Sequence, residues 1–200
     1  MTEGVLYRGG GQWPSFGTIT YPGNEWLAGT PAAALVEAGV PTSLVGLSYS
    51  ATENLEVAEL PGRGRLVCFG RSGLSERVCV DLESGVVLQI DRDGTSEHFV
   101  NSSLDAFARA VRAVIERFPF YSSESELDEY EEVASELARM IREVDPEGLV
   151  GDGFWETFIS DVSMGDYATE EIVQDIGNAV MHRIVTENRV GHMHLVAKFE

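Results

Sequence analysis

The sequence predicts an α+β fold in which helices pack on a central antiparallel sheet of about four to six strands. Residues 65–101 contain four short segments that are rich in β-branched and apolar residues, and turns containing glycine or polar residues separate them. From residue 102 the spacing of apolar residues changes from two to about 3.6, which is the period of a helix. A run of strands followed by helices is typical of a sheet with helices laid on one face.

The sequence predicts strands at residues 65–70, 77–82, 86–91 and 96–101. Residues 83–85 form a short hairpin loop, and the Asp-Gly pair at 93–94 provides the next turn. The polar connection at residues 48–61 has room for one more edge strand. A short helix precedes the sheet, with Thr30 as its cap, Pro31 at its first position and Gly39 just past its end.

Three further helices are expected after the sheet. The first starts at a Ser102 cap with Asp105 three residues later, and Pro119 ends it. Residues 125–144 form an amphipathic helix, and a last short helix ends at Gly165. The core positions expected to have the largest effect on stability are Phe107, Val111 and Trp155.

The net charge of −19 is unevenly distributed. Residues 118–175 hold seventeen acidic and two basic residues, whereas residues 176–200 are nearly neutral. A strongly acidic surface repels nucleic acid and anionic membranes and attracts cationic proteins. We therefore expect a basic protein partner, and neither nucleic acid nor a membrane.

The sequence contains no basic leader followed by an apolar segment, and no apolar run of about eighteen residues. We therefore expect a cytoplasmic protein. Cys68 and Cys79 lie on neighbouring predicted strands, and a lone pair of this kind indicates two reduced thiols in the core.

Known catalytic motifs are missing from the sequence. There is no nucleophile elbow, phosphate-binding loop, zinc-protease helix or Cys-x-x-Cys pair. We expect no enzyme activity, no catalytic residues, no cofactor and no metal. The alternative is a hydrolase or metal enzyme that uses His98, or the terminal pair His192 and His194.

The acidic face of the 125–144 helix is the predicted partner-binding surface, since its like charges repel one another at a spacing of four. The alternative is a solvated face that serves solubility. If the helix is not the interface, the aromatic-rich N-terminal loops around Trp13 and Tyr21 are the next candidates. The predicted binding residues are Asp128, Glu129, Glu131, Glu132 and Glu136.

Several segments resemble the SUKH-4 group of bacterial immunity proteins, in the superfamily that includes the yeast Smi1/Knr4 proteins. The most specific segment is Val-Asn-Ser-Ser-Leu at residues 100–104, supported by Gly-Val-Pro at 39–41 and the Phe-Trp pair at 154–155. The resemblance covers about residues 25–168. We assign residues 1–175 to this domain and residues 176–200 to a C-terminal extension of uncertain origin.

The resemblance implies a SUKH-like fold and a non-enzymatic protein of the bacterial cytoplasm. Such a protein binds and neutralises a cognate polymorphic toxin by direct contact, often a nuclease or a nucleic-acid deaminase. An acidic chain without a catalytic motif fits a basic toxin. The alternative is a regulatory or scaffold module that binds a basic host protein through the same acidic helix.

Overall fold

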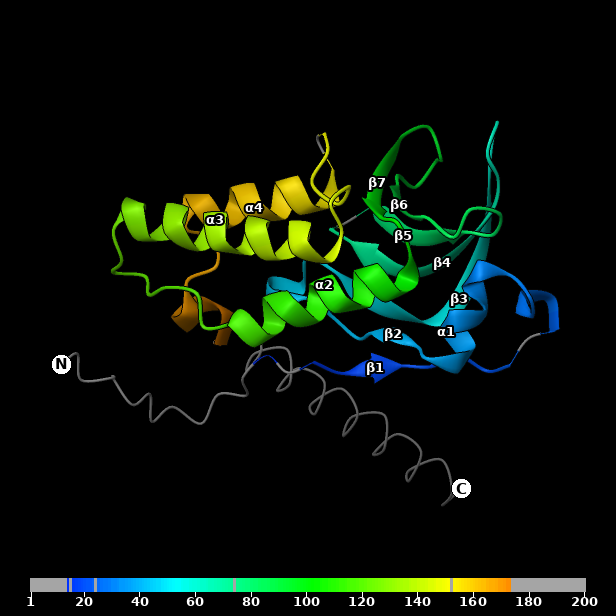
Figure 1. Cartoon of the computed structure of the whole chain (residues 1–200), viewed down its shortest axis with the longest axis horizontal. Helices are drawn as coiled ribbons and strands as arrows, with labels where there is room; N and C mark the ends of the chain where they lie inside the picture. The colour runs from blue at the N-terminus through cyan, green and yellow to red at the C-terminus, as the bar shows by residue number, and fades with distance from the viewer. Residues whose placement is uncertain (1–13, 15, 24, 74, 152, 174–200) are drawn as a thin grey trace, which may run out of the picture.

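A layer of helices lies beside a five-stranded antiparallel sheet, and a small two-stranded sheet flanks both (Figure 1). The structure is a computed structural model that describes residues 14, 16–23, 25–73, 75–151 and 153–173. Within these residues the predicted α+β fold is confirmed. Trp13, the terminal His192 and His194, and the proposed extension at 176–200 lie outside the described residues.

The main sheet is a meander in which each strand pairs antiparallel with the next one along the chain. The four predicted strands are present, and the polar connection before them forms a long edge strand. The strands are β3 (Ser50–Leu60), β4 (Gly64–Ser72), β5 (Glu76–Asp81), β6 (Val87–Ile90) and β7 (Glu97–Asn101).

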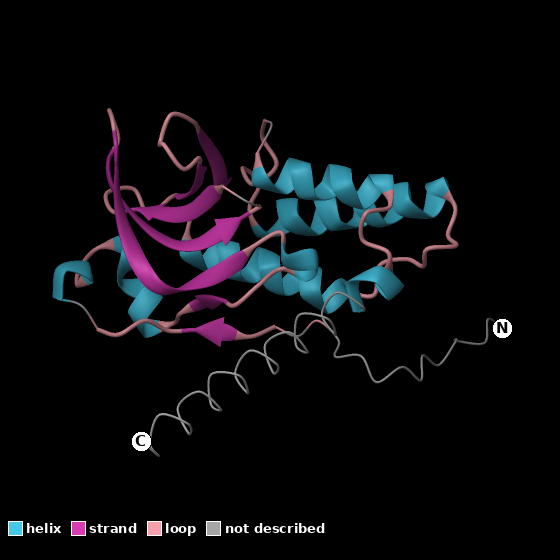
Figure 2. Ribbon diagram, turned by 180° about the vertical axis from the view of Figure 1, so that it is seen from behind, coloured by secondary structure: helices cyan, strands magenta, loops and turns pink. Residues whose placement is uncertain are grey.

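The two faces of the sheet bury different apolar clusters, because side chains alternate along each strand. The helix-facing side carries Val67, Phe69, Val78, Val80, Val87 and Val100. The opposite side is concave, because the sheet curls around it (Figure 2). A smaller cluster lies on this concave side and consists of Leu60, Leu66, Cys68, Cys79, Leu88 and Ile90.

Cys68 and Cys79 are joined by a disulfide, so the prediction of two reduced thiols is wrong. The two residues are direct partners in the pairing of β4 with β5. Directly opposed residues of an antiparallel pair have adjacent side chains. The spacing of cysteines along the sequence does not reveal this register, which depends on how the two strands pair.

Helix α2 (Leu104–Arg117) covers the helix-facing side of the sheet, and Phe107 and Val111 are buried beneath it as predicted. Its cap is Ser103, whose hydroxyl accepts a hydrogen bond from the N–H of Ala106 at 3.1 Å. The predicted cap at Ser102 is therefore wrong by one residue. The N–H of Ser102 instead donates to a carboxylate from another helix, as described below.

Helices α3 (Leu127–Val144) and α4 (Phe154–Met164) lie side by side and antiparallel, and α3 also packs against α2 (Figure 1). As predicted, α4 ends at Gly165, which has a φ of 94°. A Cβ atom at this position would lie 2.9 Å from the ring of Tyr130, so glycine is also required for the contact between α3 and the end of α4.

The predicted short helix before the sheet is present as a 3₁₀ turn, η2 (Pro31–Ala33), which continues into α1 (Ala34–Glu37). The predicted Thr30 side-chain cap is absent, because the Thr30 hydroxyl donates to the carbonyl of Leu27 at 2.8 Å. The remaining short elements are β1 (Thr18–Ile19), which pairs with β2 (Val40–Pro41), and the 3₁₀ turns η1 (Glu25–Leu27) and η3 (Val45–Leu47).

A buried polar junction joins the sheet to all three long helices. The indole N–H of Trp155 donates to Asn101 Oδ1 at 3.0 Å, and Asn101 Nδ2 donates to Asp145 Oδ2 at 2.9 Å. The same carboxylate oxygen accepts the N–H of Ser102 at 2.7 Å. The junction therefore connects the end of β7, the start of α2, the residue after α3 and the start of α4.

We expect the junction to weaken at acidic pH. Burial raises the pKa of Asp145, but hydrogen bonds from Ser102 and Asn101 outweigh it and hold the pKa below the usual 3.8. A carboxyl whose pKa is lower when folded stabilises the protein above its unfolded pKa, and this stabilisation is lost as the pH falls through the folded value.

Urea unfolding of the parent and of Asp145→Asn between about pH 6 and about pH 2 tests this prediction. The difference in unfolding free energy between the two should be constant in the upper part of the range and shrink below about pH 4. Parallel pH profiles throughout would contradict the role of the ionised carboxylate.

Candidate partner-binding surface

The structure places four of the five predicted binding residues on the solvent side of α3. Asp128, Glu129, Glu131 and Glu132 are exposed, and within the described residues none of them forms an ion pair. Glu136 differs, because Arg117 at the end of α2 donates to its carboxylate. That pair joins two helices, so Glu136 has a structural role.

The charges of α3 are separated along its length. Asp128, Glu129, Glu131 and Glu132 lie in its first half. The second half carries Arg139 and Arg142, and Arg139 pairs with Glu143 at 2.6 Å. Acids near a helix N-terminus and bases near its C-terminus are stabilised by the helix dipole. This explains Asp128 and Glu129 in the first turn, but the effect falls off before Glu131 and Glu132.

A second acidic segment, which sequence reasoning missed, lies beside the loop that leads into α3. The segment after α4 is held by Tyr121, whose hydroxyl donates to Val162 O at 2.7 Å and accepts the N–H of Tyr167 at 3.1 Å. Burial raises the pKa of Tyr121 to about 12, so this hydroxyl stays protonated. The segment carries the exposed acids Asp166 and Glu171.

The negative field at this end of the molecule acts on neighbouring groups. Burial and then the like charge of Asp166 raise the pKa of Asp161 above 3.8. The high acid density of residues 161–175 is visible in the sequence. Its position beside α3 depends on the contact of Gly165 with Tyr130, which only the fold shows.

Two large apolar side chains are exposed at the same end. Leu127 begins α3 and is 59% exposed, and Met164 ends the antiparallel α4 and is 62% exposed (Figure 1). Apolar groups surrounded by charged residues are typical of the centre of a protein interface. We call this surface the acidic helix end and define it by Leu127, Asp128, Glu129, Glu131, Glu132, Met164, Asp166 and Glu171.

The N-terminal loops are a weaker alternative. Tyr21 is buried, and its hydroxyl donates to the carbonyls of Phe69 and Thr52. Trp26, in the same loops, is 36% exposed.

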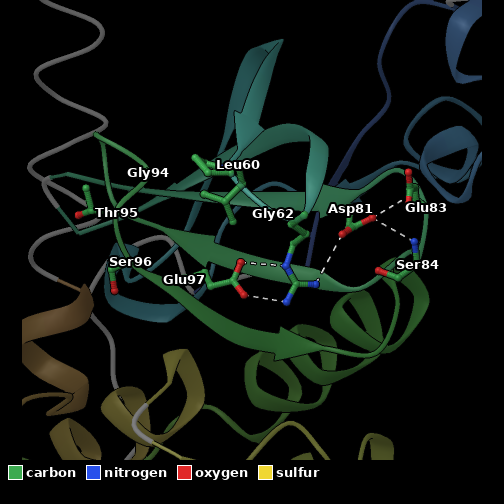
Figure 3. A pocket seen from close by; sticks show the side chains of 11 residues that line it. Leu60, Gly62, Asp81, Glu83, Ser84, Gly94, Thr95, Ser96 and Glu97 are labelled. Carbon is green, nitrogen blue, oxygen red and sulfur yellow. Dashed lines mark hydrogen bonds and ion pairs between the residues drawn. The ribbon is translucent and has the colours of Figure 1, made fainter.

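An open cleft of about 820 Å³ lies over the concave side of the sheet (Figure 3). Arg63 donates to both carboxylate oxygens of Glu97, at 2.8 and 2.7 Å, and lies 3.6 Å from Asp81. Asp81 also accepts the N–H groups of Glu83 and Ser84. These charges satisfy one another, so they fasten the β3–β4 hairpin to the start of β7.

His98 lies in a smaller cleft of about 390 Å³ between the sheet and α4. Its Nε2 is 3.1 Å from the hydroxyl of Ser96, and Asp161 and Tyr167 line the same cleft. The Tyr167 hydroxyl forms a hydrogen bond with Ser48. In the described part of the chain no three His, Cys, Asp or Glu side chains are arranged to bind a metal ion.

None of the helices that the structure describes is both long and apolar enough to span a membrane.

Comparison with known proteins identifies the family of the chain. A family model described as SUKH-4 immunity protein matches residues 24–161, which is more than half of the chain. No curated protein and no solved structure matches the chain. The matched residues include the whole five-stranded sheet, the buried polar junction and the acidic half of α3. The chain therefore belongs to the SUKH-4 immunity protein family.

Proposed function

We propose that this protein binds a cognate toxin through the acidic helix end and neutralises it by direct contact. The supporting observation is a group of exposed carboxylates without ion pairs in the described residues, on the first half of α3. Family membership implies immunity function. A cationic toxin domain, such as a nuclease or a nucleic-acid deaminase, presents the complementary charge, because its substrate is polyanionic.

The charge and the apolar groups of this surface have different effects on binding. Exposed acids raise the association rate with a basic partner, and this effect weakens as salt screens the charges. Leu127 and Met164 lose water on contact and slow dissociation. A protein seated in the cationic groove of a toxin excludes the nucleic-acid substrate from the same groove, so no chemical step by this protein is needed.

Reversing two charges on α3 tests the proposal. We expect Glu131→Lys combined with Glu132→Lys to slow association with the toxin domain encoded beside this gene by about tenfold or more at low salt. Both side chains are exposed and lie beyond the first turn, so the melting temperature should change little. Stopped-flow or surface-based kinetics over a salt series measures both the rate and its salt dependence.

Glu59→Lys combined with Glu83→Lys is the matched control, because it changes the net charge equally at exposed positions of the sheet, away from α3 and from the N-terminal loops. The control should retain most of the association rate. Equal slowing by both double variants would mean that only the overall charge matters and would exclude the acidic helix end as the interface.

A further inference from the structure

We propose that the concave side of the sheet contains a binding site for a small oxyanion of the phosphate or polycarboxylate class, formed by Arg71, Arg77 and Arg92. These residues line a cleft of about 400 Å³ together with Glu56, Ser75 and Glu76. The site lies on the sheet, away from the acidic helix end, and it does not depend on the toxin-binding proposal.

The pairing of the strands brings the arginines together. Arg71 at the end of β4 is the direct partner of Arg77 at the start of β5. Arg77 lies two residues before Cys79, so it projects from the concave side. Arg71 projects from the same side, because it pairs with Arg77 beyond the bulge that follows Cys68. Arg92 follows β6 by two residues, and its carbonyl accepts a hydrogen bond from Arg77 Nη2 at 3.2 Å.

The fold leaves this positive charge uncompensated. Like charges directly opposite each other on an antiparallel pair are unfavourable. The ion pairs in the described part of the chain involve Arg63, Arg109, Arg117 and Arg139, and none involves the three arginines of this cleft. A protein with a net charge of −19 has many acids that could lie here.

The two acids that line the cleft form no ion pair with its arginines. Glu76 accepts a hydrogen bond from Gln89 Nε2 at 2.9 Å. Gln89 alternates with Leu88 and Ile90 of the concave cluster, so this bond draws the carboxylate toward the helix-facing side. Glu56 is exposed on the edge strand β3 and forms no ion pair among the described residues.

The guanidinium of Arg77 also lacks a hydrogen-bond acceptor for one of its nitrogens. Its Nη2 donates to the carbonyls of Asp91 and Arg92, which fixes the guanidinium in place. Its Nε is buried and finds no acceptor in the described residues. Buried donors without acceptors are uncommon in folded proteins. A bound oxyanion would offset the positive charge of Arg71, Arg77 and Arg92 together, and arginine forks match phosphate and carboxylate geometry.

Calorimetric titration of the full chain at constant ionic strength tests the site, with inorganic phosphate, citrate and adenosine monophosphate as probes. We expect saturable binding of at least one probe. Tighter binding of the nucleotide than of phosphate assigns the site to a phosphate ester, and tighter binding of citrate assigns it to a polycarboxylate. No saturable heat with any of the three probes would overturn the proposal.

Arg71→Gln and Arg92→Gln should each weaken binding about tenfold or more, because each removes a charge-assisted hydrogen-bond donor. Arg142→Gln is the matched control, since Arg142 is an exposed arginine of α3, and it should bind like the parent. Equal binding by Arg71→Gln, Arg92→Gln and the parent would overturn the assignment.

The stability of the variants without ligand separates binding from a structural role. We expect Arg71→Gln to melt at the same or a higher temperature than the parent, because it removes an opposed like charge. The increase in melting temperature that the anion causes in the parent should be absent in Arg71→Gln. If Arg71→Gln instead lowers the melting temperature and keeps the anion response, Arg71 is structural and the proposal fails. Arg92 is exposed in a turn and provides a second variant that does not disturb the sheet.

Discussion

Replacing Trp155 by alanine is expected to lower the free energy of unfolding by about 3–5 kcal/mol. The side chain is fully buried, and its indole N–H donates to Asn101. The substitution removes the largest fully buried side chain of the core and leaves the Asn101 carbonyl oxygen without this donor. Urea unfolding followed by circular dichroism measures the change.

Trp155→Phe separates the two contributions. This variant keeps most of the apolar volume but removes the hydrogen-bond donor. Its unfolding free energy should therefore fall by about 1–3 kcal/mol, the cost of one unsatisfied buried acceptor. A Trp155→Ala variant within about 1 kcal/mol of the parent would show that the junction contributes little to stability.

Phe107→Ala should have an effect of similar size, about 3–5 kcal/mol in unfolding free energy. Phe107 is fully buried where α2 meets the sheet. Its ring centroid lies 5.0 Å from that of Tyr49, 5.7 Å from that of Phe69 and 6.4 Å from that of Phe154, in edge-to-face geometry. Its removal therefore creates a cavity between the sheet and the helical layer.

Phe107→Leu is the control, because it retains much of the volume while losing the aromatic contacts. We expect a loss of about 1–1.5 kcal/mol for this variant, near the contribution of aromatic pairs beyond area burial. Equal losses for the leucine and alanine variants in urea melts would mean that the cavity does not determine the effect.

Much of the fold follows from local patterns in the sequence. The β-branched runs and the Asp-Gly turn of residues 65–101 predict the strands to within a few residues, because both are local signals. The helical spacing that buries Val133, Leu137 and Ile141 is local in the same sense. The predicted helix cap is wrong because two neighbouring residues suit that position equally well. Ser102 and Ser103 are both suitable caps, and the tertiary contact of Ser102 with Asp145 decided between them.

The candidate site was predicted only in part. The acids of α3 are visible as one face of a helix, but the pairing of Glu136 with Arg117 requires the packing of α3 on α2. The additional acids Asp166 and Glu171 join the surface because the chain folds back at Gly165. The approach of segments distant in sequence is a property of packing, and no periodicity encodes it.

By itself, the sequence determined the class of fold, the boundaries of most elements, the acidic charge of the second half and the segments shared with the SUKH-4 family. Only the tertiary structure decided which side chains meet. It paired Cys68 with Cys79, opposed Arg71 to Arg77 and joined Trp155 to Asp145 through Asn101. Strand and helix propensities depend on neighbouring residues, whereas strand register and helix packing depend on how distant surfaces fit together.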